Sequence, residues 1–282
     1  MEVASNRRVL GPDGKVKYVR YSSTADPQIR AAPEGVIDPY VQLLSFWDGD
    51  KLLVSMTYYA THPQSYYGKG GVSYDFPGLA RRLRENELPD AMHIHFNGAG
   101  GNVAAGKYND GSPANRAVLA GRLATGMKDA FDSVQKTPIT TANVSWRVTA
   151  AALPLSKHYQ SKVLAAQVAD GKLAPPVRLA AARNYVWAER CEAGEKIDIA
   201  CLHIGPAYVL HMPGELFVEY QLSAQKMRPH APVLMAAYGD YGPGYIGTAI
   251  GYTQGGYETG PASRVSPKVE EVLLKAMRHV LK

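Results

Sequence analysis

The sequence lacks several features that would assign it at once to a well-marked class of protein. Its 282 residues contain no apolar run close to the roughly 20 residues that a membrane-spanning helix needs. Its two cysteines, Cys191 and Cys201, are too few for a disulfide framework and have no zinc-finger spacing. We expect them to be reduced, with a single bridge across a hairpin as the alternative if the chain works outside the cytosol. Residues 1–16 include no apolar segment of the kind found in signal peptides. What remains is an ordinary globular composition, and the core must hold the fold together.

Basic residues outnumber acidic ones but do not form a patch. The chain has 31 Lys and Arg against 25 Asp and Glu, a net charge of +6. The densest basic stretch, "ARRLREN" at 80–86, has the pattern of a solvent-exposed helix face. Nucleic-acid-binding proteins concentrate positive charge on one face or stripe. The sequence therefore does not favour a nucleic acid as partner.

Strands and helices mix along the chain, with no repeat and no linker between domains. Apolar runs on either side of "DGD" at 48–50 predict a β-hairpin over about 40–61, and a second hairpin turns at Gly205-Pro206. Apolar residues at helical spacing predict further elements. These helices cover about 75–86, 113–135, 158–170, 175–192, 216–228 and 267–280. The mixture predicts an α/β (or α+β) fold, a mixed β-sheet flanked by helices, in a single domain over 1–282.

Two segments have no clear periodicity. Residues 1–38 are polar and rich in turn residues, and they do not form a unit of their own. Residues 239–263 are rich in glycine and tyrosine. A long loop inside a compact domain is usually functional or disordered, and the aromatic content argues against disorder. We therefore expect the second segment to contribute to a site.

Polar residues stand where predicted strands run into loops, which is where α/β folds place their sites. His62 ends the apolar run at 52–61 and precedes Pro63; it is either a polar strand end or a metal ligand. Glu215 follows a Pro-Gly turn at a helix start, where the helix dipole alone would favour it. His93 and His95 alternate along one strand and share a face. That spacing can hold a metal, although two half-exposed positions are the commoner case.

The glycine-rich loop "NGAGGN" at 97–102 allows two interpretations. Its backbone N–H groups could bind an oxyanion, or it could be a tight turn between a strand and a helix. It lacks the lysine and the spacing of a Walker motif, so nucleotide binding is poorly supported. The residues that would form such an oxyanion loop are Gly100, Gly101 and Asn102.

Taken in order, four segments resemble the catalytic domain of the neutral/alkaline, non-lysosomal ceramidase family, particularly its bacterial branch. They are "YATHPQSYYG", "NGAGGNVAAGKYND", "MPGELFVEYQ" and "GPGYIGTAIGYTQGGYET", and the match extends over about 62–258. Members of this family hydrolyse the amide bond of N-acyl-sphingosines with one zinc ion. The resemblance therefore implies a zinc-dependent hydrolase of linear amides, with Zn²⁺ as cofactor and a small-molecule or lipid amide as substrate.

The resemblance also implies roles for individual residues. His62 matches the histidine of the family's "ATH" strand end, Glu215 the glutamate of its "PGE" turn, and Tyr245 its zinc-bound tyrosine. Tyr257, twelve residues later, matches a second tyrosine that contacts the substrate or the transition state. Because zinc bonds are about 2.0–2.2 Å long, we expect the ligand atoms of the first three to lie within about 5 Å of one another.

The chain also departs from the family's pattern. The family's other zinc histidine lies in a His-x-His motif with no counterpart here, and a substrate-binding histidine and an arginine also fall upstream of the match. We therefore expect a domain that lacks its N-terminal part, as well as the family's C-terminal β-sandwich. His93 or His95 would then be the substitute metal ligand. Asn102 and Ala104 replace an aspartate and a serine of the family's glycine loop, which leaves the substrate of this chain open.

Three functional hypotheses follow from these observations. The chain is a zinc-dependent amidase, a truncated product or pseudoenzyme that keeps the fold, or a non-catalytic binding module that uses the tyrosine-rich loop. Removal of N-terminal strands would expose a sheet edge and an apolar patch, so we expect self-association. Relatives are usually exported, whereas residues 1–16 carry no such signal, so the sequence assigns no compartment.

Overall fold

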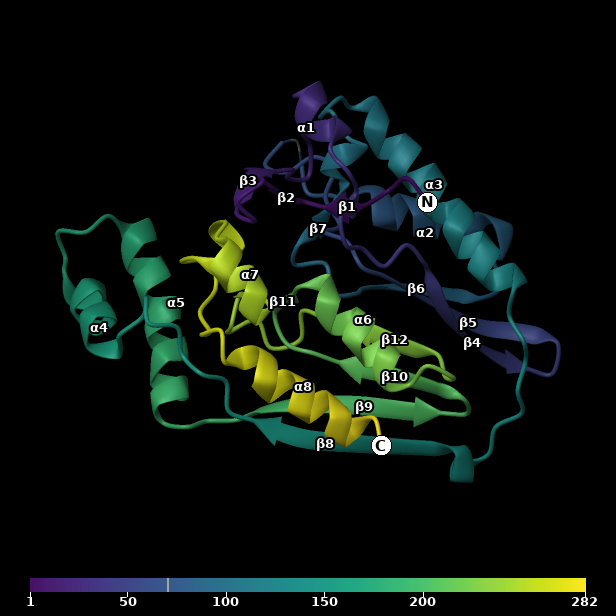
Figure 1. Ribbon diagram of the computed structural model, residues 1–282. Coiled ribbons are helices and arrows are strands. Elements are labelled where there is room, and N and C mark those ends of the chain that lie inside the picture. The colour runs from purple at the N-terminus through teal and green to yellow at the C-terminus, as the bar shows by residue number, and fades with distance from the viewer. Residues whose placement is uncertain (70) are drawn as a thin grey trace.

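A mixed four-stranded sheet forms one half of the protein in the computed structural model, which describes residues 1–69 and 71–282 (Figure 1). Its strand order is β12-β10-β9-β8, in which β10 and β12 are parallel and the other pairs antiparallel. The strands are β8 (Val144–Ala151), β9 (Ile197–Ile204), β10 (Ala207–His211) and β12 (Val233–Ala236). Helices α6 (Val218–Met227) and α8 (Val269–Val280) cover one face of this sheet (Figure 1).

A three-stranded sheet forms the other half. In it, β4 (Gln42–Asp48) and β5 (Lys51–Tyr59) make the predicted hairpin, and β6 (Met92–Asn97) adds in parallel to β5. Helices α2 (Asp75–Glu87) and α3 (Ala114–Asp132) lie against it (Figure 1). A backbone hydrogen bond of 3.1 Å from the Ala237 N–H to the Asn97 carbonyl joins the two sheets at β6 and β12. The predicted α/β class, with mixed sheets flanked by helices, is confirmed.

The main core lies between the four-stranded sheet and helices α6 and α8. The predicted helical spacing of the last helix is correct, and its apolar face is buried against the strands. A fully buried Leu, Phe or Met contributes about 1.5–3 kcal/mol, so this layer is a major source of stability. Its fully buried members include Leu210, Met212, Phe217, Leu273 and Met277.

Short elements fill the two segments that lack periodicity. Residues 1–38 contain β1 (Ser5–Asn6), β2 (Arg8–Leu10), β3 (Val16–Val19) and α1 (Pro27–Ala31). Residues 239–263 contain β13 (Tyr245–Ile246), α7 (Ala249–Gln254) and the 3-10 turn η3 (Tyr257–Thr259). Two short pairings tie these segments to the body: β1 with β7 (Val103–Ala104), and β13 with β11 (Glu215–Leu216). The expectation of a plain loop over 239–263 is therefore wrong.

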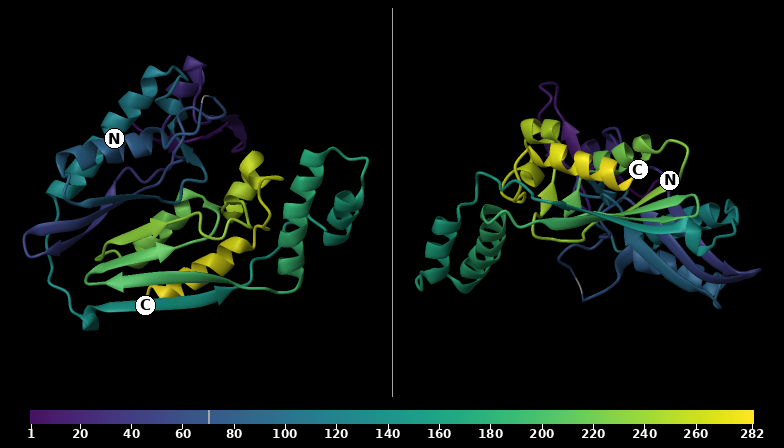
Figure 2. Two further views of the ribbon diagram at one scale, coloured as in Figure 1. Left: turned by 180° about the vertical axis from the view of Figure 1, so that it is seen from behind. Right: turned by 90° about the horizontal axis from the view of Figure 1, so that it is seen from below.

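A helical hairpin extends away from the two sheets, as both views of Figure 2 show. It consists of α4 (Ser161–Ala169) and α5 (Pro175–Glu192), close to the predicted ranges. Trp187 of α5 anchors it, because a Cβ added to Gly242 would lie 2.3 Å from the Trp187 ring. Within the described residues, no helix combines the length and apolarity needed to cross a membrane.

Candidate active site

Two paired strands place the first two site residues side by side. Glu215 of β11 and Tyr245 of β13 are direct partners in a parallel pairing, although thirty residues separate them in sequence. His62 comes three residues after the end of β5. Backbone pairing therefore brings together residues that the sequence places on separate segments.

The side chains of His62, Glu215 and Tyr245 converge. His62 Nε2 lies 2.9 Å from Glu215 Oε2 and 3.2 Å from Tyr245 OH. His62 is 5% exposed and Glu215 6% exposed, so both are buried polar groups that need partners. His62 Nε2 therefore lies within the expected distance of both other ligand atoms, and the role of the three residues as zinc ligands stays a prediction.

The orientation of the His62 ring is fixed from behind by the glycine-rich loop. His62 Nδ1 lies 2.7 Å from the Gly100 carbonyl and 3.0 Å from the Val103 carbonyl, and both carbonyls can only accept. Nδ1 must therefore carry a proton, and in the neutral ring Nε2 presents its lone pair to Glu215 and Tyr245. Metal-bound histidines typically donate their other N–H to a carbonyl or carboxylate in this way.

A lone pair on His62 Nε2 would repel the Glu215 carboxylate at 2.9 Å unless something positive lies between them. Either a proton makes the ring an imidazolium that is ion-paired with Glu215, or a metal ion is shared by both. The observed geometry suits both arrangements. The two differ chemically, because only the second provides an electrophile.

Glu215 is held in its ionised form. Burial would raise the pKa of Glu215, but hydrogen bonds from His62 and from the Tyr241 hydroxyl outweigh burial and keep that pKa below its usual value. Tyr241 donates to Oε1, while Oε2 faces His62. The carboxylate is therefore anionic at neutral pH and fixed at both oxygens. Tyr241 has no sequence signal beyond its place in the tyrosine-rich segment.

Tyr257 joins the cluster through Tyr245, whose hydroxyl lies 3.3 Å from its own. Burial raises the pKa of Tyr257 and, despite the nearby Arg7 charge, also that of Tyr245. Both phenols are therefore protonated at neutral pH in the absence of a metal. Tyr257 can donate its O–H to an oxygen atom that approaches Tyr245 and His62.

Arg7 is a site residue that the sequence did not identify. The family's arginine was expected upstream and absent, yet this arginine, from the aperiodic first segment, is 3% exposed and lies in the cluster. Its Nη1 is 3.5 Å from His62 Nε2, and its guanidinium lies 5.1 Å and 5.0 Å from the ring centres of Tyr245 and Tyr257. The Arg7-Arg8 doublet in a polar segment was the only available signal.

The glycine loop positions other groups, and at Gly101 it does not offer a free N–H. The Gly101 N–H donates to the Leu216 carbonyl at 2.6 Å, and a Cβ there would lie 2.2 Å from the Glu215 carbonyl oxygen. Asn102 accepts the Val218 N–H at 2.8 Å at the start of α6. The loop therefore packs under His62 and β11, and the interpretation of Gly101 as an oxyanion donor is wrong because its N–H is already used.

His93 and His95 do not join the cluster, so neither substitutes for the missing ligand. His93 Nε2 contacts the Leu88 carbonyl at 3.2 Å, and His95 Nδ1 contacts Thr57 Oγ1 at 2.9 Å. Burial, with Arg81 of α2 nearby, lowers the pKa of His95 to about 4. The physical reason is position: both histidines lie within β6 and face α2, whereas His62 lies beyond a strand end.

The donor set nevertheless fits a zinc ion. In residues 1–69 and 71–282, no three His, Cys, Asp or Glu side chains group closely enough to hold a metal, so the phenol of Tyr245 is needed as third donor. Separations of 2.9 and 3.2 Å are slightly shorter than the roughly 3.3–3.6 Å between ligands of a tetrahedral zinc with bonds of about 2.0–2.2 Å. One nitrogen and two oxygen donors leave a position open, as in catalytic zinc sites.

Neither a protein-family model nor a curated protein sequence matches the chain. Solved structures match its fold. One is neutral ceramidase from Pseudomonas aeruginosa, with a TM-score of 0.65 and 16% identity over 100% of this chain and 51% of that chain. Another is a ceramidase complexed with C2, with a TM-score of 0.64 and 14% identity over 99% and 51%. The chain therefore spans about half the length of these ceramidase structures.

This likeness confirms the predicted resemblance at the level of the fold. The chain has the architecture of about half of neutral ceramidase, over its whole length. At such low identity the likeness says nothing by itself about chemistry. The metal, the substrate and the role of each residue therefore rest on the geometry of the cluster.

Proposed function

We propose that the chain is a zinc-dependent hydrolase that cleaves the amide bond of an N-acyl lipid or a related linear amide. The observation that carries this proposal is the convergence of His62 Nε2, Glu215 Oε2 and Tyr245 OH from three distant segments. These three atoms would hold the zinc ion. When bound, zinc would supply Lewis acidity toward a carbonyl group and toward water.

The residues around this donor set have separable tasks. The Gly100 and Val103 carbonyls hold the His62 ring with Nε2 toward the cluster. Tyr241 fixes the Glu215 carboxylate by donating to its other oxygen. Groups fixed in this way need no reorganisation when a ligand binds, which is the basis of electrostatic preorganisation.

Tyr257 would act as the donor to the oxygen that gains charge as the amide carbonyl is attacked. Its phenol is protonated at neutral pH because burial raises its pKa. Its hydroxyl lies 3.3 Å from Tyr245 OH, so a carbonyl oxygen between the donor set and Tyr257 is within reach of its O–H. The Arg7 guanidinium packs against the Tyr257 ring on the same side.

Zinc analysis of the purified chain, combined with hydrolysis of a short-chain N-acyl-sphingosine, tests the proposal. We expect about one zinc per chain and hydrolysis that is lost on chelation and restored by added zinc. His62→Ala is the matched negative control for both measurements. A folded chain that takes up no zinc would contradict the proposal and favour the pseudoenzyme or binding-module hypothesis.

A further inference from the structure

Two arginines close to the N-terminus converge on one buried carboxylate close to the C-terminus. Arg7 Nε contacts Glu258 Oε1 at 3.0 Å, and Arg8 Nη1 contacts Glu258 Oε2 at 3.1 Å. Glu258 is fully buried, and Arg7 and Arg8 are 3% and 8% exposed. Buried charges persist only when they are paired, so the two arginines and Glu258 form one electrostatic unit.

This unit touches the site at two points. Glu258 directly follows Tyr257 in η3, so the carboxylate and the phenol extend from the same short turn. Arg7 uses its Nε on Glu258, while its Nη1 reaches to 3.5 Å from His62 Nε2. Among the described residues, Arg7 Nη2 is buried without a hydrogen-bond partner. The Nε of this guanidinium is therefore committed to Glu258, while its Nη1 faces the cluster.

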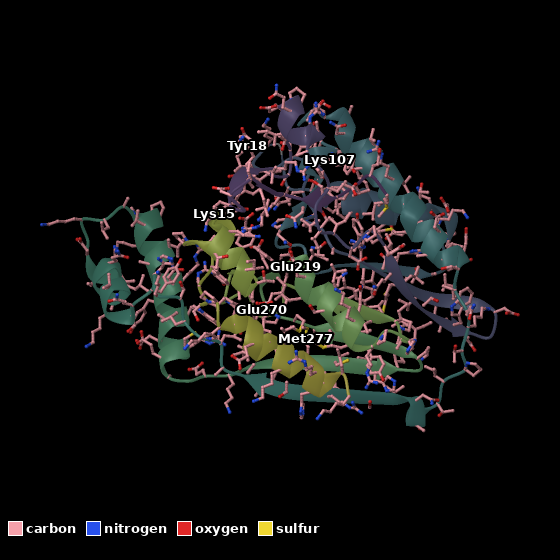
Figure 3. All side chains as sticks on the ribbon, in the orientation of Figure 1. Lys15, Tyr18, Lys107, Glu219, Glu270 and Met277 are labelled. Carbon is pink, nitrogen blue, oxygen red and sulfur yellow. The ribbon has the colours of Figure 1, made fainter. Side chains whose placement is uncertain are left out.

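The first segment is fastened to the same region by further contacts. Arg8 Nη2 donates to the Gly251 carbonyl at 2.9 Å, and Lys15 Nζ donates to the Thr253 carbonyl at 2.7 Å. Figure 3 shows Lys15 beside α7. These contacts join side chains of the first segment to backbone carbonyls of α7, whereas Glu258 alone contacts the Arg7 guanidinium as a counter-charge among the described residues.

A guanidinium this close to His62 creates a problem for a divalent cation. Arginine is charged at every physiological pH, and like charges a few ångströms apart repel strongly in a partly buried site. A zinc ion on His62 Nε2 would therefore be opposed by Arg7 unless that charge is offset and held aside. The Glu258 carboxylate offsets the charge of Arg7, and the guanidinium packs against the rings of Tyr245 and Tyr257 in cation–π contacts.

We propose that Glu258 is a positioning residue that holds Arg7 across the two tyrosine rings and offsets its charge, so that zinc can bind beside it. The inference rests on the proposed zinc site and adds a requirement to it. Glu258 acts on zinc through Arg7, so its effect must depend on the presence of Arg7.

A double-mutant cycle measures that dependence. Zinc affinity is determined by competition with a chromophoric chelator for wild type, Glu258→Gln, Arg7→Met and the double variant. We expect Glu258→Gln to weaken zinc binding about 10–100-fold, as is typical for outer partners of metal ligands. In the Arg7→Met chain the same change should have little effect, because no cation is left to hold aside. An equal loss in both chains would overturn the inference.

Glu219→Gln is the matched control. Glu219, labelled on α6 in Figure 3, is another acidic side chain on the Arg8 side, and it bonds to Asn102 instead of Arg7. Zinc affinity close to that of wild type is expected, and a loss as large as that of Glu258→Gln would overturn the inference. If Glu258→Gln fails to fold by circular dichroism, Glu258→Asp takes its place in the cycle. It shortens the side chain by one methylene and should weaken zinc binding only when Arg7 is present.

A metal-free measurement separates this inference from the proposed function. If wild type binds no zinc, the proposed function fails, and crystal structures of metal-free wild type and of the Glu258 variant decide the inference. Movement of the Arg7 guanidinium away from the Tyr245 and Tyr257 rings in the variant supports it. An Arg7 guanidinium that stays on both rings without Glu258 overturns it.

Discussion

Two buried polar regions contain histidines from neighbouring parallel strands, and the regions differ in the groups that surround the imidazole rings. His62, beyond the end of β5, faces a carboxylate and a phenol, and two carbonyls fix its other nitrogen. His93 and His95, inside β6, face α2 and contact a carbonyl and a threonine hydroxyl. The spacing of His93 and His95 resembled a metal pair more than the lone His62 did.

Whether a histidine meets possible partners for metal binding therefore depends more on its place in the sheet than on its spacing in the sequence. A residue beyond a strand end meets segments from elsewhere in the chain, here the short strands β11 and β13, and those segments carry the polar partners. A residue within a covered strand meets the helix above it.

His62→Ala should abolish stoichiometric zinc binding, because it removes a direct ligand and leaves only two oxygen donors. The loss should exceed the roughly 10–100-fold typical of an outer partner. His93→Ala is the control from the other region and should leave zinc affinity unchanged. Inductively coupled plasma analysis and chelator competition on both variants measure this. A loss of zinc affinity in the His93 variant would show that the two regions do not differ in metal binding as expected.

Tyr257→Phe should lower kcat of the zinc-loaded chain by about 10²–10³-fold, the usual cost of losing one oxyanion donor, with little change in KM. Tyr59→Phe is the control, since the hydroxyl of Tyr59, the last residue of β5, is buried and has no hydrogen-bond partner among the residues that the structure describes. Removing that hydroxyl should leave activity unchanged and leave stability equal or about 1 kcal/mol higher. Steady-state kinetics and urea unfolding give both results. Equal losses of activity would argue against a specific role for Tyr257.

His95 should make the stability of the protein depend on pH. Its pKa is about 4 in the folded protein against 6.5 when free, so between these values only the unfolded chain binds the proton. The contribution of His95 to the free energy of unfolding should therefore be constant above about pH 6.5 and fall by about 3 kcal/mol as the pH is lowered to 4. Denaturant unfolding across this range, on wild type and His95→Asn, isolates the contribution. An identical pH dependence in the variant would contradict it.

The four-stranded sheet has an exposed edge strand that lies outside the site. Its edge strand β8 exposes Val144, Trp146 and Val148 at 42–55%, and we propose that this edge supports self-association. Trp146→Lys should weaken any self-association about tenfold, equivalent to about 1.4 kcal/mol. Ser145→Lys, which places the same charge on the opposite face of the strand, is the control. Light scattering over a concentration series measures the association of both variants and of wild type. A wild-type protein that stays monomeric would contradict the proposal.

The fold was largely predictable because most of its elements are long and strongly periodic. Helix α3 begins and ends within three residues of its predicted range, and the turn of the β9–β10 hairpin falls at the predicted Gly205-Pro206. The missed elements are short. A two-residue strand such as β13 has no periodicity, and it exists only because β11 pairs with it. Such elements follow from tertiary contacts, which a local pattern does not carry.

The site was predictable only in part, for a related reason. His62 and Glu215 follow recognisable strand ends and turns, so their segments resemble known ones. Arg7, Tyr241 and Glu258 act through partners that are remote in sequence or lie on irregular backbone. No local feature of "SNRRVL" at 5–10 indicates that Arg7 packs against the ring of Tyr257. Its role follows from the fold as a whole.

The Arg7–Glu258 contact joins residues 251 positions apart, and this separation has a consequence for biosynthesis. Contacts between distant positions carry the largest loop-closure cost and form late. Arg7 is made 251 residues before Glu258. A chain synthesised only as far as His62 has neither the carboxylate that restrains Arg7 nor Tyr245, so it cannot form the cluster. At about 5–20 residues per second, Arg7 and His62 remain without these partners while the residues between them are made.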